Sequence, residues 1–336
     1  MANAERRDWM QAFLRQRTSG VIVSIAVLGA LFSVIAPHFA NLQNAEVIVA
    51  NAAILAIVAA AQGMVLLTRN LDVSVGSIMG FAAYVTADYA AHHPHVGALV
   101  ALIAIAIGGA LGAINGLIVA YGQVSPLIAT LGTMSLYRGA TYIYAHGQEV
   151  TASSLPSWVL AAVDLRIAGI PLLVMVSALV VIVTAAFLRF FPLGRRIYAI
   201  GSNPEASVFC GLRTERVTLF AFALSGMMCG FAGLLYAGRV GTVTVILASG
   251  WELTSLAAAV LGGISVAGGS GSVIGAALGA VLLSMIDNGL VLLHIPEFWR
   301  MFVQGTAIVL AVTADAAFSN QARRSLRALR FEGKLA

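Results

Sequence analysis

Charged residues are scarce in this sequence. They make up 10% of its 336 residues, whereas a soluble globular domain carries about 25%. Apolar residues reach 60%, so too few polar side chains remain to cover a surface that faces water. This composition excludes a soluble enzyme, a nucleic-acid-binding domain and a disordered scaffold. The remaining class is a polytopic membrane protein built from α-helices.

Lysine and cysteine are almost missing too. A P-loop needs a lysine followed by serine or threonine, but the single lysine, Lys334, precedes Leu335. We therefore expect no ATP hydrolysis by that route, no enzyme activity and no cofactor in this chain. Cys210 and Cys229 have no zinc-site spacing and form no disulfide framework. We predict two free thiols and no metal site.

Long apolar runs fill most of the chain. A bilayer core of about 30 Å needs roughly 20 apolar residues in a helix, and on this basis we predict ten spans. The third and eighth are short and rich in glycine and serine, so they are candidates for broken helices that line a cavity. The predicted spans are 20–36, 47–67, 73–91, 97–120, 125–145, 169–189, 217–237, 252–268, 272–293 and 299–315.

The basic residues predict the orientation. With the N-terminus inside, the inner segments hold fifteen arginines and lysines, and the outer loops hold only Arg166 and Arg239. Basic residues concentrate on the cytoplasmic side of membrane proteins, so both termini are predicted to be cytoplasmic. The expected organisation is an N-terminal segment at 1–19, a transmembrane domain at 20–315 with a long inner loop at 190–216, and a basic tail at 316–336.

Spans two to five and seven to ten would then run in opposite directions. We predict that they form two inverted repeats, a common transporter plan with the pathway between the halves. Two glycine triplets, at 108, 112 and 116 and at 271, 275 and 279, place small residues on one helix face. We interpret both as surfaces for close helix packing. Both fall in the inner half of the membrane, so they do not themselves support the repeat.

The segment 67–77, LTRNLDVSVGS, packs polar residues between two apolar spans. One interpretation is a short inner turn, in which Asp72 caps the following helix. The other is a wall of the translocation path, whose hydroxyls and amides contact a polyol. The candidate residues for that wall are Asn70, Asp72, Ser74 and Ser77.

Within the inner loop, Asn203 is a good N-cap, Pro204 suits the first helical position and Glu205 favours the positive end of the helix dipole. Gly211 can end the helix. Because so short a helix is marginal in water, we predict that it docks on a partner protein. The alternative is that it packs on the bilayer surface or on its own helix bundle. The face expected to be exposed comprises Ala206, Val208, Phe209 and Leu212.

Ionisable side chains inside spans are expensive and usually paired. Arg138 lies near the middle of the fifth span, and Asp88 and Asp287 lie in outer halves. We predict that one of these carboxylates neutralises Arg138; a substrate-facing or snorkelling Arg138 are the alternatives. Asn115, Asp287 and Asn288 are candidate hydrogen-bonding residues between helices.

The motif LTRNLDVSVGS resembles the signature of the sugar-type permeases of ATP-binding-cassette importers, the ribose, xylose, rhamnose and autoinducer-2 group. The usual family form has two glycines where Arg69 and Asn70 stand, and this variant is similar to the rhamnose and autoinducer-2 permeases. The similarity covers about residues 45–315. Further matching segments are ATLGT at 129–133, LYRG at 136–139, GRRIYAIGSNPEAS at 194–207, AAAVLGGISVAGGSGSVIGAALGA at 257–280 and LLHIPEFW at 292–299.

The resemblance implies a subunit of a larger transporter in the bacterial inner membrane. Its expected partners are a second permease, either the same or a homologous chain, two ATPase subunits that bind ATP and magnesium, and a periplasmic solute-binding protein. The helix at 203–209 would be the coupling helix in a groove of the ATPase, and Thr130 and Thr133 would join the pathway. The expected solute is rhamnose-like or autoinducer-2. The alternative is an ion-coupled secondary transporter, which would need mid-membrane acids and no docking helix.

Overall fold

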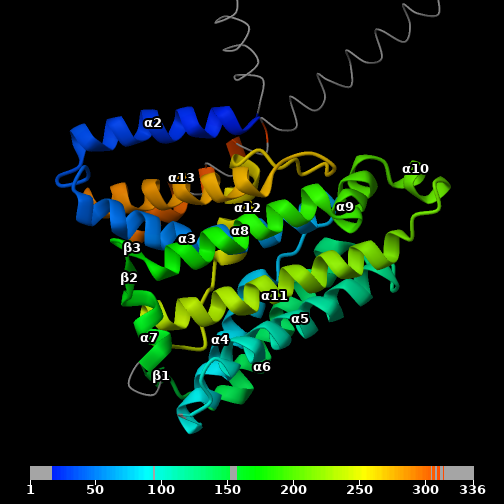
Figure 1. Ribbon diagram of the computed structural model, residues 1–336, viewed down its shortest axis with the longest axis horizontal. Coiled ribbons are helices and arrows are strands. Elements are labelled where there is room, and N and C mark those ends of the chain that lie inside the picture. Colours follow the sequence, from blue (N-terminus) through cyan, green and yellow to red (C-terminus); the bar gives the residue numbers. More distant parts are fainter. Residues whose placement is uncertain are drawn as a thin grey trace, which may run out of the picture.

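The long apolar runs of the sequence form long helices that lie side by side (Figure 1). The structure, a computed structural model, describes residues 17–93, 95–151, 157–303, 305–306, 309–310 and 313. Within these residues, five helices are long and apolar enough to cross a membrane, as in a polytopic membrane protein. They are α3 (Leu42–Leu67), α5 (Leu99–Ala120), α8 (Leu172–Phe190), α11 (Thr214–Val240) and α13 (Val273–Leu292).

The two short spans behave differently. Helix α4 (Val75–His92) is continuous through the third predicted span. Helix α12 (Trp251–Leu261) has only 11 residues and ends well before residue 268, because the following glycines take left-handed conformations, with φ of 91° at Gly263 and 81° at Gly268. Of the two candidates for a break, the eighth span is therefore the interrupted one.

The strands are short. Strand β1 (Val150–Thr151) pairs antiparallel with β4 (Thr242–Val243), and β2 (Arg166–Ile167) pairs with β3 (Ile170–Pro171). The predicted tenth span, 299–315, is described only in part, and its described residues are helical, whereas the predicted terminal segments lie largely outside the described residues. The other helices are α2 (Arg17–Ile35), α6 (Pro126–Ala145), α7 (Ser157–Asp164), α9 (Pro192–Ser202) and α10 (Pro204–Phe209).

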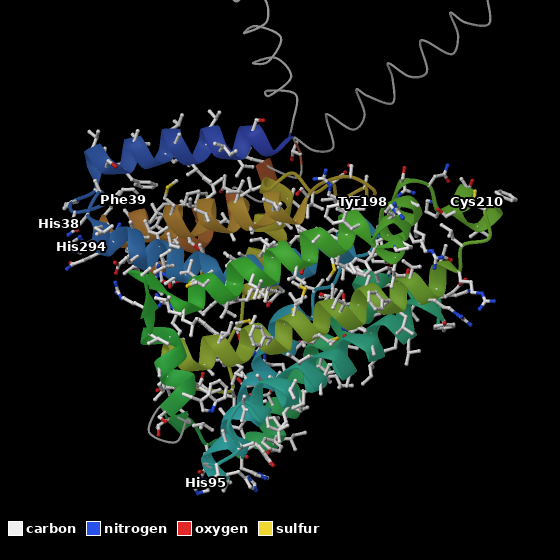
Figure 2. The ribbon with its side chains drawn as sticks, viewed as in Figure 1. His38, Phe39, His95, Tyr198, Cys210 and His294 are labelled. Carbon is white, nitrogen blue, oxygen red and sulfur yellow. The ribbon has the colours of Figure 1, made fainter. Side chains whose placement is uncertain are left out.

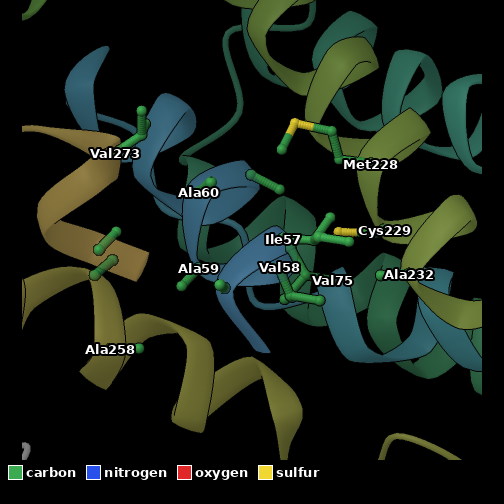
Figure 3. Close-up of a cluster of buried hydrophobic side chains, with 14 of the residues drawn as sticks. Ile57, Val58, Ala59, Ala60, Val75, Met228, Cys229, Ala232, Ala258 and Val273 are labelled. Atoms are coloured by element: carbon green, nitrogen blue, oxygen red, sulfur yellow. The ribbon is translucent and has the colours of Figure 1, made fainter. Parts of the chain in front are cut away.

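The core is formed around α3, which is buried along most of its length. Figure 3 shows Ile57 and Val58 of α3 facing Cys229 of α11, and all three side chains are completely buried. Alanines dominate this stretch of α3, so neighbouring helices approach it closely. Cys229 is a free, buried thiol and Cys210 a free, exposed one, as predicted.

Glycines also bring α5 against α11. A Cβ at Gly108 would collide with the backbone of Gly226, and one at Gly112 with the carbonyl of Phe222. A Cβ at Gly116 would collide with Leu219. The first glycine triplet is therefore a packing surface, as predicted.

The second triplet is only partly such a surface. Gly279 packs against the backbone of Ala258 and Gly262 in and after α12, and Gly275 lies beside Gly262. Gly271 instead precedes α13 and has a φ of 129°. Its role is therefore in the turn before the helix.

The packing of one half of the chain is repeated in the other half in exchanged form, so that in each case a helix of one half packs on helices of the other half. Helix α3 packs against α13 and α12, while α11 packs against α5 and α4. If α3, α4 and α5 are matched with α11, α12 and α13, each set of contacts maps onto the other. The sequence agrees, because Asn115–Gly116 near the end of α5 matches Asn288–Gly289 near the end of α13.

The molecule has two distinct ends (Figure 2). Tyr198 and Cys210 lie at one end, together with α9 and α10, and we call it the α10 end. His38, His95 and His294 lie at the other, which we call the histidine end. The arginine-rich loop 190–216 is thus separated from these histidines by the length of the helices.

Candidate functional site

A buried polar network lies where α4 begins, toward the α10 end. Asp72 Oδ1 accepts hydrogen bonds from the backbone N–H of Ser74 at 2.9 Å and from its hydroxyl at 2.6 Å. Asp72 thus closes the turn that precedes α4. The N-cap of α4 is Ser74, without a side-chain capping hydrogen bond, so the prediction that Asp72 caps this helix is wrong. The second oxygen, Oδ2, is buried without a hydrogen-bond partner among the described residues.

This network joins three helices. Asn115 of α5 donates to the Ser74 hydroxyl at 2.6 Å, and the Tyr137 hydroxyl of α6 donates to Asn115 Oδ1 at 3.0 Å. Thr130 of α6 accepts from the N–H of Val73 at 3.1 Å. Asn115 therefore links helices, as predicted, and the segment before α4 is fixed to both α5 and α6.

Most of the predicted pathway residues are inside this packing. Asn70 alone is half-buried, and its amide donates to Thr68. Their assignment to a solute path stays a prediction, and none of them lines the cavity described below. The buried members are Asp72, Ser74, Ser77, Thr130 and Thr133.

Arg138 requires a correction. Its guanidinium donates to the backbone carbonyls of Leu247 at 2.8 Å and Val245 at 3.3 Å, in the segment before α12. In the part of the chain that the structure describes, it forms no ion pair with Asp88 or Asp287. Backbone carbonyls in the irregular segment accept from Nη1 of the guanidinium, and a sequence pattern does not reveal such acceptors.

The two carboxylates have other partners. Asp88 accepts a hydrogen bond from the Tyr144 hydroxyl at 2.9 Å. Asp287 pairs with Arg300 at 3.0 Å, and Arg300 also contacts Glu297. Both carboxylates that were predicted as possible partners of Arg138 thus have other partners.

Glu252 is a half-buried acid that the sequence did not reveal. Its Oε1 accepts from the N–H of Gly250 at 3.2 Å, and its Oε2 is buried without a hydrogen-bond partner within the described ranges. Glu252 lies in the first turn of α12, and Asp72 lies just before α4. The tripeptides Asp72-Val73-Ser74 and Glu252-Leu253-Thr254 share the order acid, apolar residue, hydroxyl residue. This acid–apolar–hydroxyl pattern is the signal that could have revealed it.

A cavity of about 600 Å³ opens toward the histidine end. It lies between α3, α11, α12, α13 and the residues after Pro296. Of the predicted site residues, only Asp287 lines it. Sequence reasoning missed the cavity because its walls come from helices that lie far apart in the chain.

Helix α10 has the predicted local structure. Asn203 Oδ1 accepts from the N–H of Ala206 at 3.0 Å, Pro204 and Glu205 occupy the first turn, and Gly211 follows with a φ of 77°. Phe209 is 91% exposed, which is unusual for a phenylalanine. The helix is therefore preformed and presents its apolar residue to the outside.

Helix α9, which the sequence did not reveal, holds α10 on the bundle. Gly201 packs against the carbonyl of Leu67 at the end of α3 and against Gly269. The Tyr198 hydroxyl donates to the carbonyl of Gly271 at 3.0 Å, and the N–H of Gly269 donates to the carbonyl of Leu67 at 3.0 Å. The 67–70 and 265–271 turns and α9 therefore form one connected layer at the α10 end.

Comparisons with known proteins agree with the motifs. The sequence model of a family described as "Branched-chain amino acid transport system / permease component" matches residues 44–312. The autoinducer 2 import system permease protein LsrC of Yersinia enterocolitica is 36% identical over 323 residues, which cover 94% of this chain and 87% of that protein.

Two further relatives carry the same name. The protein from Yersinia pseudotuberculosis is 34% identical and covers 95% of this chain and 90% of its own length. The protein from Enterobacter sp. strain 638 is 34% identical, and the match covers 96% of this chain and 93% of that protein. No solved structure matches. With four fifths of its length matched by the family and its relatives similar from end to end, the chain belongs to this family of permease subunits of ATP-binding-cassette importers.

Proposed function

We propose that this chain is the permease subunit of an importer for autoinducer-2 or a closely related small sugar. The observation that carries the proposal is the identity of 34–36% to autoinducer-2 import permeases over 94–96% of the chain. The family description mentions branched-chain amino acids, but the relatives with this end-to-end similarity are named for the furanosyl signal. A rhamnose-like sugar is the alternative solute, since Arg69 and Asn70 resemble both permease groups.

The chain works with partners that supply energy and affinity. Two ATPase subunits bind ATP and magnesium, a periplasmic binding protein delivers the solute, and a second permease, identical or homologous, completes the channel. Phe209 on α10 supports the ATPase contact, because a six-residue helix with an exposed aromatic side chain suits a protein groove. The α10 end is then cytoplasmic and the histidine end periplasmic.

The proposed membrane topology has ten spans, both termini in the cytoplasm, and inverted halves. The exchanged contacts of α3 and α11 support the repeat. So do the matched Asn–Gly pairs of α5 and α13. A pseudo-two-fold axis in the membrane plane would place Asp72 toward the cytoplasm and Glu252 toward the periplasm.

The connected layer at the α10 end suggests how a movement of the ATPase subunits is transmitted to the translocation pathway. Helix α10 adjoins α9, and α9 contacts the 67–70 and 265–271 turns. The first turn leads into α4, and the second connects α12 with α13. A displacement of α10 would therefore move elements of both halves together, which is what a switch between outward-facing and inward-facing states requires.

An ion-coupled transporter acting alone is the weaker alternative. Its carboxylates would have to be available to an ion near mid-membrane, but Asp287 is paired with Arg300, and Asp72 is enclosed by Ser74 and Asn115. The preformed α10 would also have no use in such a protein.

Uptake in cells tests the proposal. We would express the chain with its partner subunits in a strain without its own autoinducer-2 importer, and follow removal of autoinducer-2 and of labelled L-rhamnose from the medium. Uptake of autoinducer-2 that requires both this chain and a hydrolysis-competent ATPase is expected. Uptake that persists with an inactive ATPase would contradict the proposal, and uptake of rhamnose alone would change the solute.

A further inference from the structure

Four ionisable side chains line the cavity at the histidine end: Arg239, Asp287, Glu297 and Arg300. Arg239 and Asn51 meet across it, with the guanidinium donating to Asn51 Oδ1 at 2.8 and 3.1 Å. On another wall, Arg300 pairs with Asp287 and Glu297. Polar and charged groups at membrane depth usually face a water-filled cavity or a ligand path.

The wall between these polar groups is aromatic. The rings of Tyr236 and Trp251 lie with their centroids 4.7 Å apart, and both residues line the cavity. Thr254 and Ser284 add hydroxyl groups from α12 and α13. An aromatic surface beside guanidinium, carboxylate and hydroxyl groups suits a small ring that has apolar C–H faces and hydroxyls around its edge.

The charges of the lining indicate a neutral solute. Two arginines, Arg239 and Arg300, are matched by two carboxylates, Asp287 and Glu297, so the formal charges cancel and no net field selects an anion or a cation. A volume of about 600 Å³ falls within the range of about 300–1,000 Å³ that is usual for small-molecule pockets.

We propose that this cavity is the site at which the permease receives a neutral, polyhydroxylated small ring such as a furanose or pyranose. The proposal deepens the proposed function and rests on it. The cavity opens at the end that would face the binding protein, and α12, which forms its floor, connects through residues 262–272 with the layer that carries α10. Solute would contact this site before it moves toward the buried network around Asp72.

Protection of an introduced thiol tests the site directly. In a Cys210→Ser background, Thr254→Cys would be placed in the complete transporter and treated with a small, charged methanethiosulfonate reagent. We expect labelling in the nucleotide-free state, and severalfold slower labelling in millimolar autoinducer-2 or L-rhamnose but not in L-leucine. His294→Cys, exposed at the same end and not part of the cavity lining, is the control whose labelling sugar should not change.

Uptake by two tryptophan variants is the second test of the site. Trp251→Ala is expected to lower uptake about tenfold, the equivalent of about 1.4 kcal/mol. Trp299→Ala, at a half-exposed side chain that does not line the cavity, should leave uptake within about twofold, a change of under half that energy. Co-purification of the ATPase with both variants shows that each is assembled.

The outcomes separate the site from the proposed function. Thr254→Cys that labels at the same rate with and without sugar, or that never labels, overturns the site even where uptake is normal. Equal uptake by Trp251→Ala and Trp299→Ala does the same. Protection by leucine alone overturns the solute class. Protection by sugar in a complex without ATP-dependent uptake supports the site and contradicts the importer function.

Discussion

Arg69 adopts a backbone conformation that is usually left to glycine. Its φ is 65°, a region that costs a residue with a Cβ roughly 1–2 kcal/mol, and the usual family signature has glycine there. The side chain partly offsets this strain, since Nε donates to the carbonyl of Ala267 at 2.7 Å. The turn after α3 is thereby tied to the turn after α12.

Replacement of Arg69 separates the two effects. Arg69→Ala loses the hydrogen bond and keeps the strain, whereas Arg69→Gly loses the bond and relieves the strain. We expect Arg69→Gly to be more stable than Arg69→Ala by about 1 kcal/mol. The apparent melting temperature of the detergent-purified permease measures this, and an Arg69→Ala variant at least as stable as Arg69→Gly would argue against a strained turn.

The carbonyl contacts of Arg138 lead to a second prediction. Arg138→Met leaves the acceptors of Val245 and Leu247 without their donor and should destabilise the protein by about 1–3 kcal/mol. Arg138→Lys keeps a donor and should recover part of this. Adding Asp88→Asn or Asp287→Asn to Arg138→Met should restore nothing, and rescue by either one in a melting experiment would revive the predicted ion pair.

At the level of elements, the crossing of α5 and α11 depends on glycine. A Cβ at Gly226 would collide with the backbone of Gly108 and Gly112, so Gly226→Ala should force the helices apart at a cost of about 1–3 kcal/mol. Gly20 of α2 has open space around its Cβ position, so Gly20→Ala is the matched control and should be neutral or slightly stabilising. Equal melting temperatures for the two variants would show that the crossing tolerates a wider spacing.

Helix α10 presents an outer face that no other described residue covers. Phe209→Ala combined with Glu205→Arg should leave folding unchanged, because Phe209 is 91% exposed, but should reduce ATPase co-purification and uptake. Phe190→Ala, at an exposed residue that ends α8, is the control expected to retain both. Full recruitment by the double variant would contradict the coupling role of α10.

At the level of the molecule, the two ends should differ in access. Cys210 is an exposed thiol at the α10 end, and Cys229 is buried. A membrane-impermeant maleimide should therefore leave the wild-type chain unlabelled in intact spheroplasts and label it once at Cys210 after permeabilisation. Cys210→Ser should abolish that label. Labelling of Cys210 in sealed spheroplasts would reverse the proposed orientation.

Local chemistry explains what the sequence could and could not predict. Apolar runs predicted the long helices, and Asn203, Pro204 and Gly211 predicted α10, because these signals act within a few residues. The partner of Arg138 and the cavity depend on segments more than 100 residues apart. Helix α9 was missed because its buried face is small and mostly made of isoleucine and glycine.

The exchanged packing of α3 and α11 has a consequence for biogenesis. Helix α3 finds α13 only after about 200 further residues have been made, which takes roughly 10–40 s at ribosomal rates of about 5–20 residues per second. During that time its alanine-rich surface has only lipid and early helices around it. Neither half is then expected to mature alone, and a chain truncated before α13 should be a preferred substrate for membrane proteases.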